Sequence, residues 1–120
     1  MFQIIFNEIS ASEISQLDTL EQLRLLNQFK VSPDDLDKPD GERFGRIERD
    51  GKILYRYRSQ EYRIYFEIAG DSVIVHRVLH KGTFSDFLFR SKLPLSEDEE
   101  LSQSKHFWKL IEAGEKARRV

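Results

Sequence analysis

The stretch Tyr55–Arg90 combines side chains whose types and spacing suit contact with a phosphate backbone. Its aromatic and aliphatic residues can build a sheet, but it holds more charge than a sheet needs. The cations in question are Arg56, Arg58, Arg63, Arg77, His80 and Lys81. Positive side chains gathered on one surface attract phosphates, so nucleic acid is the first partner to consider.

The charge distribution along the chain is uneven, although its sum is only −2. Residues 1–40 carry a net charge of −5, residues 41–93 of +4, and residues 94–120 of −1. A basic middle between acidic flanks forms a binding surface if its cations share one face of the fold. Alternatively, the flanks and the middle neutralise each other within the folded domain.

Length and composition limit the classes to which the protein can belong. With 120 residues, 39% of them hydrophobic, we expect one domain that spans residues 1–120 and has a real core. There is no cysteine, and the three histidines are scattered, so neither a disulfide nor a metal site is expected. The N-terminus does not resemble a signal peptide, and no segment approaches the roughly 20 apolar residues of a membrane span. We therefore expect a cytoplasmic protein with no membrane partner.

The N-terminal third predicts one strand followed by helices. Residues 2–6 alternate weakly, as a strand does. Apolar residues at spacings of three and four between about residues 11 and 30 predict helical structure. This is either one helix or two, the second capped by Asp18. Ser32–Asp35 indicates a helix stop, and the polar segment from there to Gly41 is expected to be a surface loop.

The middle of the chain alternates with period two, which predicts a sheet. The first two strands are expected at Phe44–Arg49 and Lys52–Arg58, joined by Asp50-Gly51, the strongest hairpin signal in the chain. Two more antiparallel strands are expected at Tyr62–Ile68 and Ser72–Leu79. The last of these is apolar on both faces, which indicates a central position.

Helical signals return after the sheet. Residues Thr83–Phe89 are compatible with a short helix, and a longer final helix is expected over about residues 96–118. The pair Ser96 and Glu99 has the spacing of a capping box, and Trp108 would anchor that helix. The element order predicts an α+β domain: an N-terminal strand and helices, a curved antiparallel sheet of about four strands, and a C-terminal helix. We expect the helices to pack on one face of the sheet.

This order, with the strand sequences LYRYRSQEYRIYFEI and VIVHRVLHKGTF, resembles the RelE/ParE toxin superfamily. The most specific segment is Glu61–Phe66, which is similar to the family's Gly-Tyr-Arg-ϕ-ϕ-Tyr strand. The second is Leu79-His80-Lys81, at a strand end where many members carry Gly-His-Arg or Gly-Lys-Arg. The resemblance is good over roughly residues 43–90.

The resemblance implies a RelE-like toxin of a toxin–antitoxin system. RelE-type members bind the ribosomal A site and cut mRNA there without a metal or other cofactor, because the 2′-hydroxyl attacks the adjacent phosphate. ParE-type members act on DNA gyrase instead. An antitoxin usually lies across toxins of both kinds. The partners implied are therefore RNA on the ribosome and an antitoxin-like protein, and no cofactor is implied.

Carried onto this chain, the resemblance gives Arg63, His80 and Lys81 as catalytic residues. Arg63 matches the strand arginine that contacts the scissile phosphate, and Lys81 matches the second cation, next to His80. The reaction needs an acid, a base and cations that stabilise the phosphorane, and a histidine can transfer protons near neutral pH. The expected RNA-binding residues are Arg56, Arg58, Tyr65 and Arg77. The arginines would hold phosphates, and the tyrosine would stack on a base.

Two features argue against a ribonuclease. RelE-type enzymes often carry a tyrosine about six residues after the second cation, where this chain has Phe87, or Phe84 or Phe89 if the alignment slips. Phenylalanine neither donates nor accepts a proton. The isoelectric point of about 5.9 is also low for a protein directed at ribosomal RNA. The alternatives are a non-catalytic RelE-fold module that binds RNA or a protein through the same sheet face, and a ParE-like gyrase inhibitor.

The cations also have structural interpretations. Arg63 can pair with a glutamate across the sheet, and Arg56 and Arg58 can be solvated charges on an edge strand. His80 can be exposed at a strand end without a catalytic role. His76 is expected in the core or at an interface.

Overall fold

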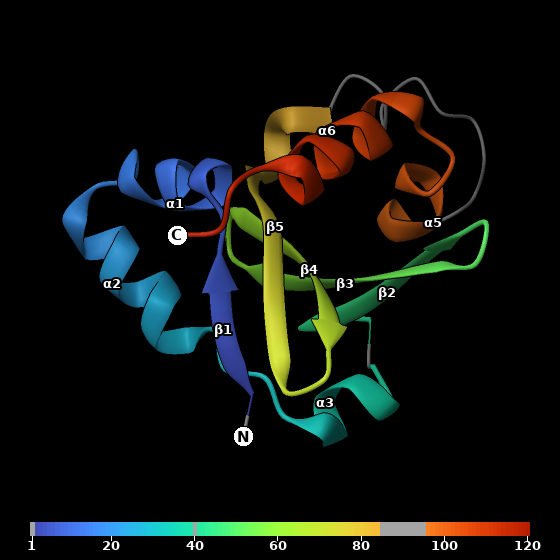
Figure 1. Cartoon of the computed structure of the whole chain (residues 1–120), viewed down its shortest axis with the longest axis horizontal. Coiled ribbons are helices and arrows are strands. Elements are labelled where there is room, and N and C mark those ends of the chain that lie inside the picture. The colour runs from blue at the N-terminus through green and yellow to red at the C-terminus, as the bar shows by residue number, and fades with distance from the viewer. Residues whose placement is uncertain (1, 40, 85–95) are drawn as a thin grey trace.

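A computed structural model describes residues 2–39, 41–84 and 96–120, which form one five-stranded sheet with helices around it (Figure 1). The elements are β1 (Gln3–Phe6), α1 (Glu8–Ser15), α2 (Thr19–Gln28), α3 (Pro33–Asp37), β2 (Phe44–Arg49), β3 (Lys52–Ser59), β4 (Tyr62–Ala69), β5 (Ser72–His80), the 3₁₀ turn η1 (Lys81–Phe84), α5 (Glu97–Leu101) and α6 (Lys105–Lys116). The strand order is β1-β5-β4-β3-β2. Strands β2 to β5 form an antiparallel meander, and β1 pairs with β5 in parallel. The predicted α+β class and the order of its elements are confirmed.

Side-chain caps define the helices of the N-terminal third. The Asn7 side chain accepts a hydrogen bond from the Ser10 backbone and starts α1, and Asp18 starts α2 in the same way. The version with two helices is therefore correct. The prediction of a loop after Ser32 is wrong in part, because Ser32 caps the short helix α3, which has Pro33 at its first position.

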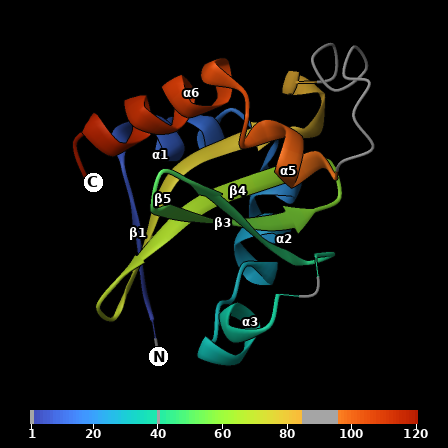
Figure 2. The same ribbon diagram turned by 90° about the vertical axis from the view of Figure 1, so that its right-hand side faces the viewer.

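The sheet is apolar on both faces, so helices cover both. The face toward α2 and α3, called the α2 face, carries the buried residues Phe44, Tyr57, Ile64, Phe66, Val73, Val75 and Val78. The opposite face, called the α6 face, carries Ile47, Leu54, Tyr65 and Leu79 and packs against Leu101, Phe107 and Ile111 of α5 and α6. Figure 2 shows α5 and α6 above the strands and α2 and α3 below them. The expectation that all helices share one face is therefore wrong.

The expected C-terminal helix is two helices. Ser96 caps α5 as predicted, but the chain turns after Leu101, and Ser104 caps α6 by accepting from the Phe107 backbone. Trp108 holds this turn, since its Nε1 donates to the carbonyl of Ser102 at 2.8 Å. Of the short helix expected over residues 83–89, the structure places only the 3₁₀ turn that ends at Phe84, because residues 85–95 lie outside the described residues.

Helix α6 approaches β5 closely because Gly114 has no side chain. A Cβ atom there would overlap the backbone carbonyl of His76. The Asn7 side chain lies where α6 meets β5, and its amide donates to the carbonyls of Val75, His76 and Gly114 at 2.8–3.1 Å. Within the described residues, no helix is long and apolar enough to cross a membrane.

Candidate nucleic-acid interface

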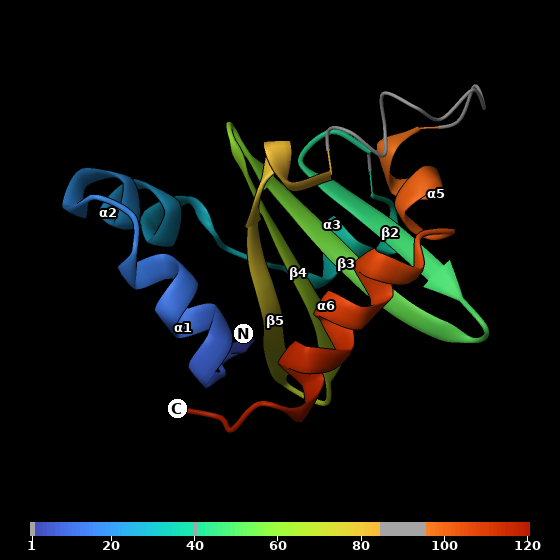
Figure 3. The same cartoon turned by 90° about the horizontal axis from the view of Figure 1, so that it is seen from above.

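Two arginines lie directly opposite each other in the sheet. In the β3–β4 register Arg58 pairs with Arg63, and both side chains lie on the α6 face, beneath α5. Like charges in directly opposite positions destabilise a sheet, so this pair needs an anion. Figure 3 shows α5 next to β2, the edge strand that neighbours β3.

Glu42 lies 3.7 Å from Nη1 of Arg58 alone, and the carboxylate that reaches both arginines, Glu97 of α5, supplies that anion incompletely. Its carboxylate oxygens lie 3.6 Å from Nη2 of Arg58 and 3.7 Å from Nε of Arg63, which is beyond hydrogen-bond range. The Nε atoms of both arginines are buried and have no hydrogen-bond partner within the described part of the chain. Buried donors left without partners are costly, and the two arginines therefore form a site prepared for an anion.

The environment of Arg63 adds to this interpretation. The residue is only 8% exposed, and its Nη1 donates to the carbonyls of Gln60 and Tyr62 at 2.9 and 3.1 Å. Burial lowers the pKa of Arg63, Glu97 opposes that shift, and the charge of Arg58 adds to it. An anion with more oxygens than a carboxylate would relieve both the missing hydrogen bonds and the repulsion.

Arg56 lies on the same face but is fully paired. It is 0% exposed, and its Nε and Nη2 donate to the two carboxylate oxygens of Asp98 at 3.0 and 2.8 Å. Its remaining donors reach the carbonyls of Gly41 and Glu42, both at 3.0 Å. Burial alone would lower the pKa of Arg56, but the hydrogen bonds and charge of Asp98 outweigh it, so the pKa is raised. All three nitrogens of this buried side chain are hydrogen-bonded inside the protein, so Arg56 is not placed to contact RNA, contrary to the expectation from the sequence.

Tyr65 and Arg77 are also held inside the protein. Tyr65 is 1% exposed, and its ring meets that of Phe107 edge to face at 5.0 Å, so it is not available to stack on a base. Burial raises the pKa of its hydroxyl, and the nearby carboxylates of α5 act in the same direction. Arg77 donates to both carboxylate oxygens of Glu13 and to the carbonyl of Leu110, which ties α1 and α6 to β5.

His80 and Lys81 are exposed at the end of β5. The His80 side chain is 48% exposed, its ring meets Tyr62 edge to face at 5.4 Å, and its Nε2 lies 3.7 Å from Glu61. Its Nδ1 accepts from the Gly82 backbone at 3.0 Å, which places the proton of the neutral ring on Nε2. In this neutral form Nε2 can donate a hydrogen bond to a ligand.

The predicted catalytic residues do not share one face of the sheet. Tyr62 lies opposite His80 in the β4–β5 register, and Arg63 lies opposite Leu79. Because successive residues of a strand point to opposite faces, His80 lies on the α2 face and Arg63 on the α6 face. The structure therefore groups Arg58 with Arg63 on the α6 face. His80 and Lys81 lie apart from them, at the end of β5.

Sequence reasoning missed two residues of this region, Glu97 and Tyr62. Of the acids at 97–100, only Glu99 was given a role from the sequence, as the partner of Ser96 in a capping box. Their place next to the excess positive charge of residues 41–93 is the signal that could have identified Glu97. Tyr62 could have been identified from the hairpin register, which sets it opposite His80.

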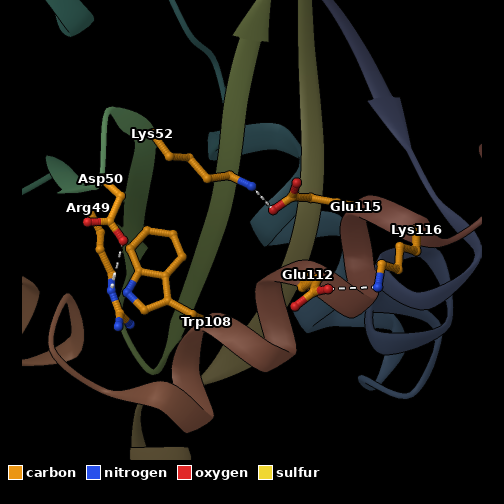
Figure 4. Close-up of a pocket in the computed structure, with 7 residues that line it drawn as sticks. All are labelled: Arg49, Asp50, Lys52, Trp108, Glu112, Glu115 and Lys116. Carbon is orange, nitrogen blue, oxygen red and sulfur yellow. Dashed lines mark hydrogen bonds and ion pairs between the residues drawn. The ribbon is translucent and has the colours of Figure 1, made fainter.

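A second hollow of the described surface lies elsewhere. It is an open groove of about 560 Å³ between the β2–β3 hairpin and α6, with Trp108 in its wall (Figure 4). Its six charged side chains pair among themselves, as Arg49–Asp50, Lys52–Glu115 and Glu112–Lys116. These six charges sum to zero and none belongs to a buried donor without a partner, so the groove is a weaker candidate than the pair of arginines. The described residues also contain no cluster of histidine and carboxylate side chains that could hold a metal.

The fold and the site together define an α+β domain with a strained pair of arginines under an acidic helix. No known protein family, curated protein or solved structure is significantly similar to the chain.

Proposed function

We propose that this chain is a RelE-like toxin that acts on translating ribosomes and binds RNA phosphate through Arg58 and Arg63. The observation that carries the proposal is the pair of buried Nε donors without partners, set between two opposed positive charges. A phosphodiester has the charge and the oxygen atoms that this position lacks. The element order expected from the RelE/ParE resemblance also occurs in the fold.

For cleavage of mRNA, the chain offers a metal-independent route. The RNA 2′-hydroxyl attacks the adjacent phosphate and releases its proton to solvent, arginines stabilise the charge of the phosphorane, the bond from phosphorus to the 5′-oxygen breaks, and the leaving 5′-oxygen takes up a proton. His80 would donate that proton from Nε2 in its imidazolium form, which requires Nδ1 to take up a proton in place of its hydrogen bond from Gly82, and Lys81 adds charge beside it. The RNA strand would have to pass around the end of β4 and β5 to contact both the arginine pair and His80.

A second candidate function is a non-catalytic RNA-binding module with the same fold. The separation of His80 and Arg63 onto opposite faces favours it, because an acid or base must reach the phosphate that the cations hold. Phe87, which stands where a tyrosine is expected, lies outside the described residues.

Induced expression in a heterologous bacterium tests the proposal, with growth recorded and mRNA 5′ ends mapped. The wild type is compared with Arg58→Gln/Lys81→Gln and with His80→Gln, at equal soluble yield. Arg46→Gln is the matched control, since Arg46 is an exposed arginine of β2 that pairs with Glu48 away from the site.

Each outcome selects one function. Growth arrest with codon-phased cuts, lost in the first variant and in His80→Gln but kept in Arg46→Gln, supports the ribonuclease. Arrest that needs Arg58 and Lys81 but produces no cuts supports binding without cleavage. Arrest that no variant relieves points to a protein target such as gyrase, and normal growth with intact mRNA contradicts the toxin proposal.

A further inference from the structure

The first turn of α5 brings four consecutive acids, Glu97 to Glu100, to the basic part of the α6 face. Two of them reach arginines of the sheet in very different ways. Asp98 makes two hydrogen bonds to buried Arg56, and its side chain is 14% exposed. Glu97 makes only the two long ion pairs, at 3.6 and 3.7 Å, and its side chain is 24% exposed. One acid therefore fixes the helix, and the other rests loosely on the arginine pair.

Helix α5 does not depend on Glu97 for its place. Leu101 is fully buried at the other end of the helix, and Ser96 caps its start. With Asp98 and Leu101 holding the backbone, the Glu97 side chain can rotate toward solvent while the helix stays docked. The movement breaks no hydrogen bond that holds the fold together.

We propose that Glu97 is an internal competitor for phosphate: its carboxylate occupies the anion position between Arg58 and Arg63 in the free protein, and an RNA phosphodiester displaces it. The inference rests on the proposed binding of RNA at this pair. A phosphate can accept from both unpaired Nε donors, whereas the carboxylate, held by its short helix, reaches neither within hydrogen-bond range. The consequence is a site whose two positive charges are partly neutralised at rest and which has lower affinity for polyanions.

The test is binding of a fluorescently labelled single-stranded RNA decamer, with 2′-O-methyl groups so that it is not cleaved, followed by anisotropy. Glu97→Gln removes the competing charge and keeps the shape of the side chain. Glu99→Gln is the matched control, because Glu99 is exposed on the same short helix and the change in net charge is identical. We expect Glu97→Gln to bind about three- to tenfold more tightly than the wild type, in keeping with the loss of one weak ion-pair contact.

A second variant separates competition from net charge. Glu97→Asp keeps the charge but draws the carboxylate back by one methylene, so we expect tighter binding than the wild type and weaker binding than Glu97→Gln. Adding Arg58→Gln to Glu97→Gln should remove the gain. Equal affinities of Glu97→Gln and Glu99→Gln, or weaker binding of Glu97→Gln in protein that melts as the wild type does, would overturn the inference.

Failure of the proposed function is recognised separately. If no variant binds the RNA, thermal melting is repeated with inorganic phosphate. A larger rise in melting temperature for Glu97→Gln than for Glu99→Gln would keep the internal competitor and reject RNA as its ligand. Equal rises, or none, would reject both.

Discussion

Removal of the Asp98 carboxylate should destabilise the whole domain, because it leaves Arg56 charged and unpaired inside the protein. Arg56 is 0% exposed, and Asp98→Ala removes two hydrogen bonds of 3.0 and 2.8 Å to its guanidinium. Breaking a buried ion pair at one partner costs about 3–5 kcal/mol. The carbonyls of Gly41 and Glu42 still hold Arg56, and the Asp98 side chain is 14% exposed, which together place the expected loss near the lower limit, about 3 kcal/mol.

Chemical denaturation in urea measures this loss as a shift of the midpoint at an unchanged slope. Glu99→Ala serves as the control, since it removes an exposed acid from the same helix and should change stability by no more than about 0.5 kcal/mol. Replacing both partners, as Arg56→Met/Asp98→Ala, should recover part of the loss because no buried charge remains. A loss below about 1 kcal/mol for Asp98→Ala would refute the claim that α5 is fixed by this pair.

Three further perturbations test the packing around β5. Alanine for glycine inside a helix ordinarily stabilises by about 0.5–1 kcal/mol, but Gly114→Ala should instead lower the melting temperature, because its Cβ overlaps the His76 carbonyl. Burial lowers the pKa of His76 below the ordinary 6.5, although Glu67 opposes the shift. The free energy of unfolding should therefore be constant above about pH 6.5 and fall as the pH drops below it. In urea denaturation, His76→Gln should flatten this pH profile. Asn7→Asp should destabilise more than Asn7→Ala in the same assay, since it turns a carboxylate toward three carbonyl oxygens. An unchanged melting temperature of Gly114→Ala would contradict the close approach at Gly114. A pH profile that His76→Gln leaves unchanged, or a smaller loss of stability for Asn7→Asp than for Asn7→Ala, would contradict the other two contacts.

The strands were predictable because their signals are local. Asp50 and Gly51 both have positive φ, 52° and 81°, as the predicted two-residue hairpin turn requires, and alternation with period two fixes the four antiparallel strands. The parallel pairing of β1 with β5 has no such signal, since the partners are some 70 residues apart and nothing in Gln3–Phe6 specifies a neighbour. The hydrophobic pattern also did not predict the break between α5 and α6, because one apolar stripe runs through both helices.

Whether each predicted cation is exposed or buried depends on segments far away in the sequence. Period two correctly groups Arg56 and Arg58 on one face of β3, but it cannot say whether that face meets water or a helix. Asp98, more than 40 residues later in the chain, makes Arg56 an interior residue. Similarly, Tyr65 is buried by Phe107, and Arg77 is paired by Glu13 from the opposite end of the chain. His76 is buried, as predicted, because its strand is covered on both faces.

Arg56 and Arg58 lie on one strand but differ in how far the protein itself satisfies their hydrogen-bond donors. Both lie on the α6 face under the same acidic helix, yet each nitrogen of Arg56 has a hydrogen-bond partner, whereas Arg58 faces a second arginine and keeps a buried Nε without one. A fold that needed only stability would gain from a neutral or acidic residue opposite Arg63. Sites that bind or react commonly retain such local strain, which the rest of the fold supports. By this argument Arg56 and Asp98 hold α5 in place, and Arg58 with Arg63 is the part of the sheet where we propose that a ligand binds.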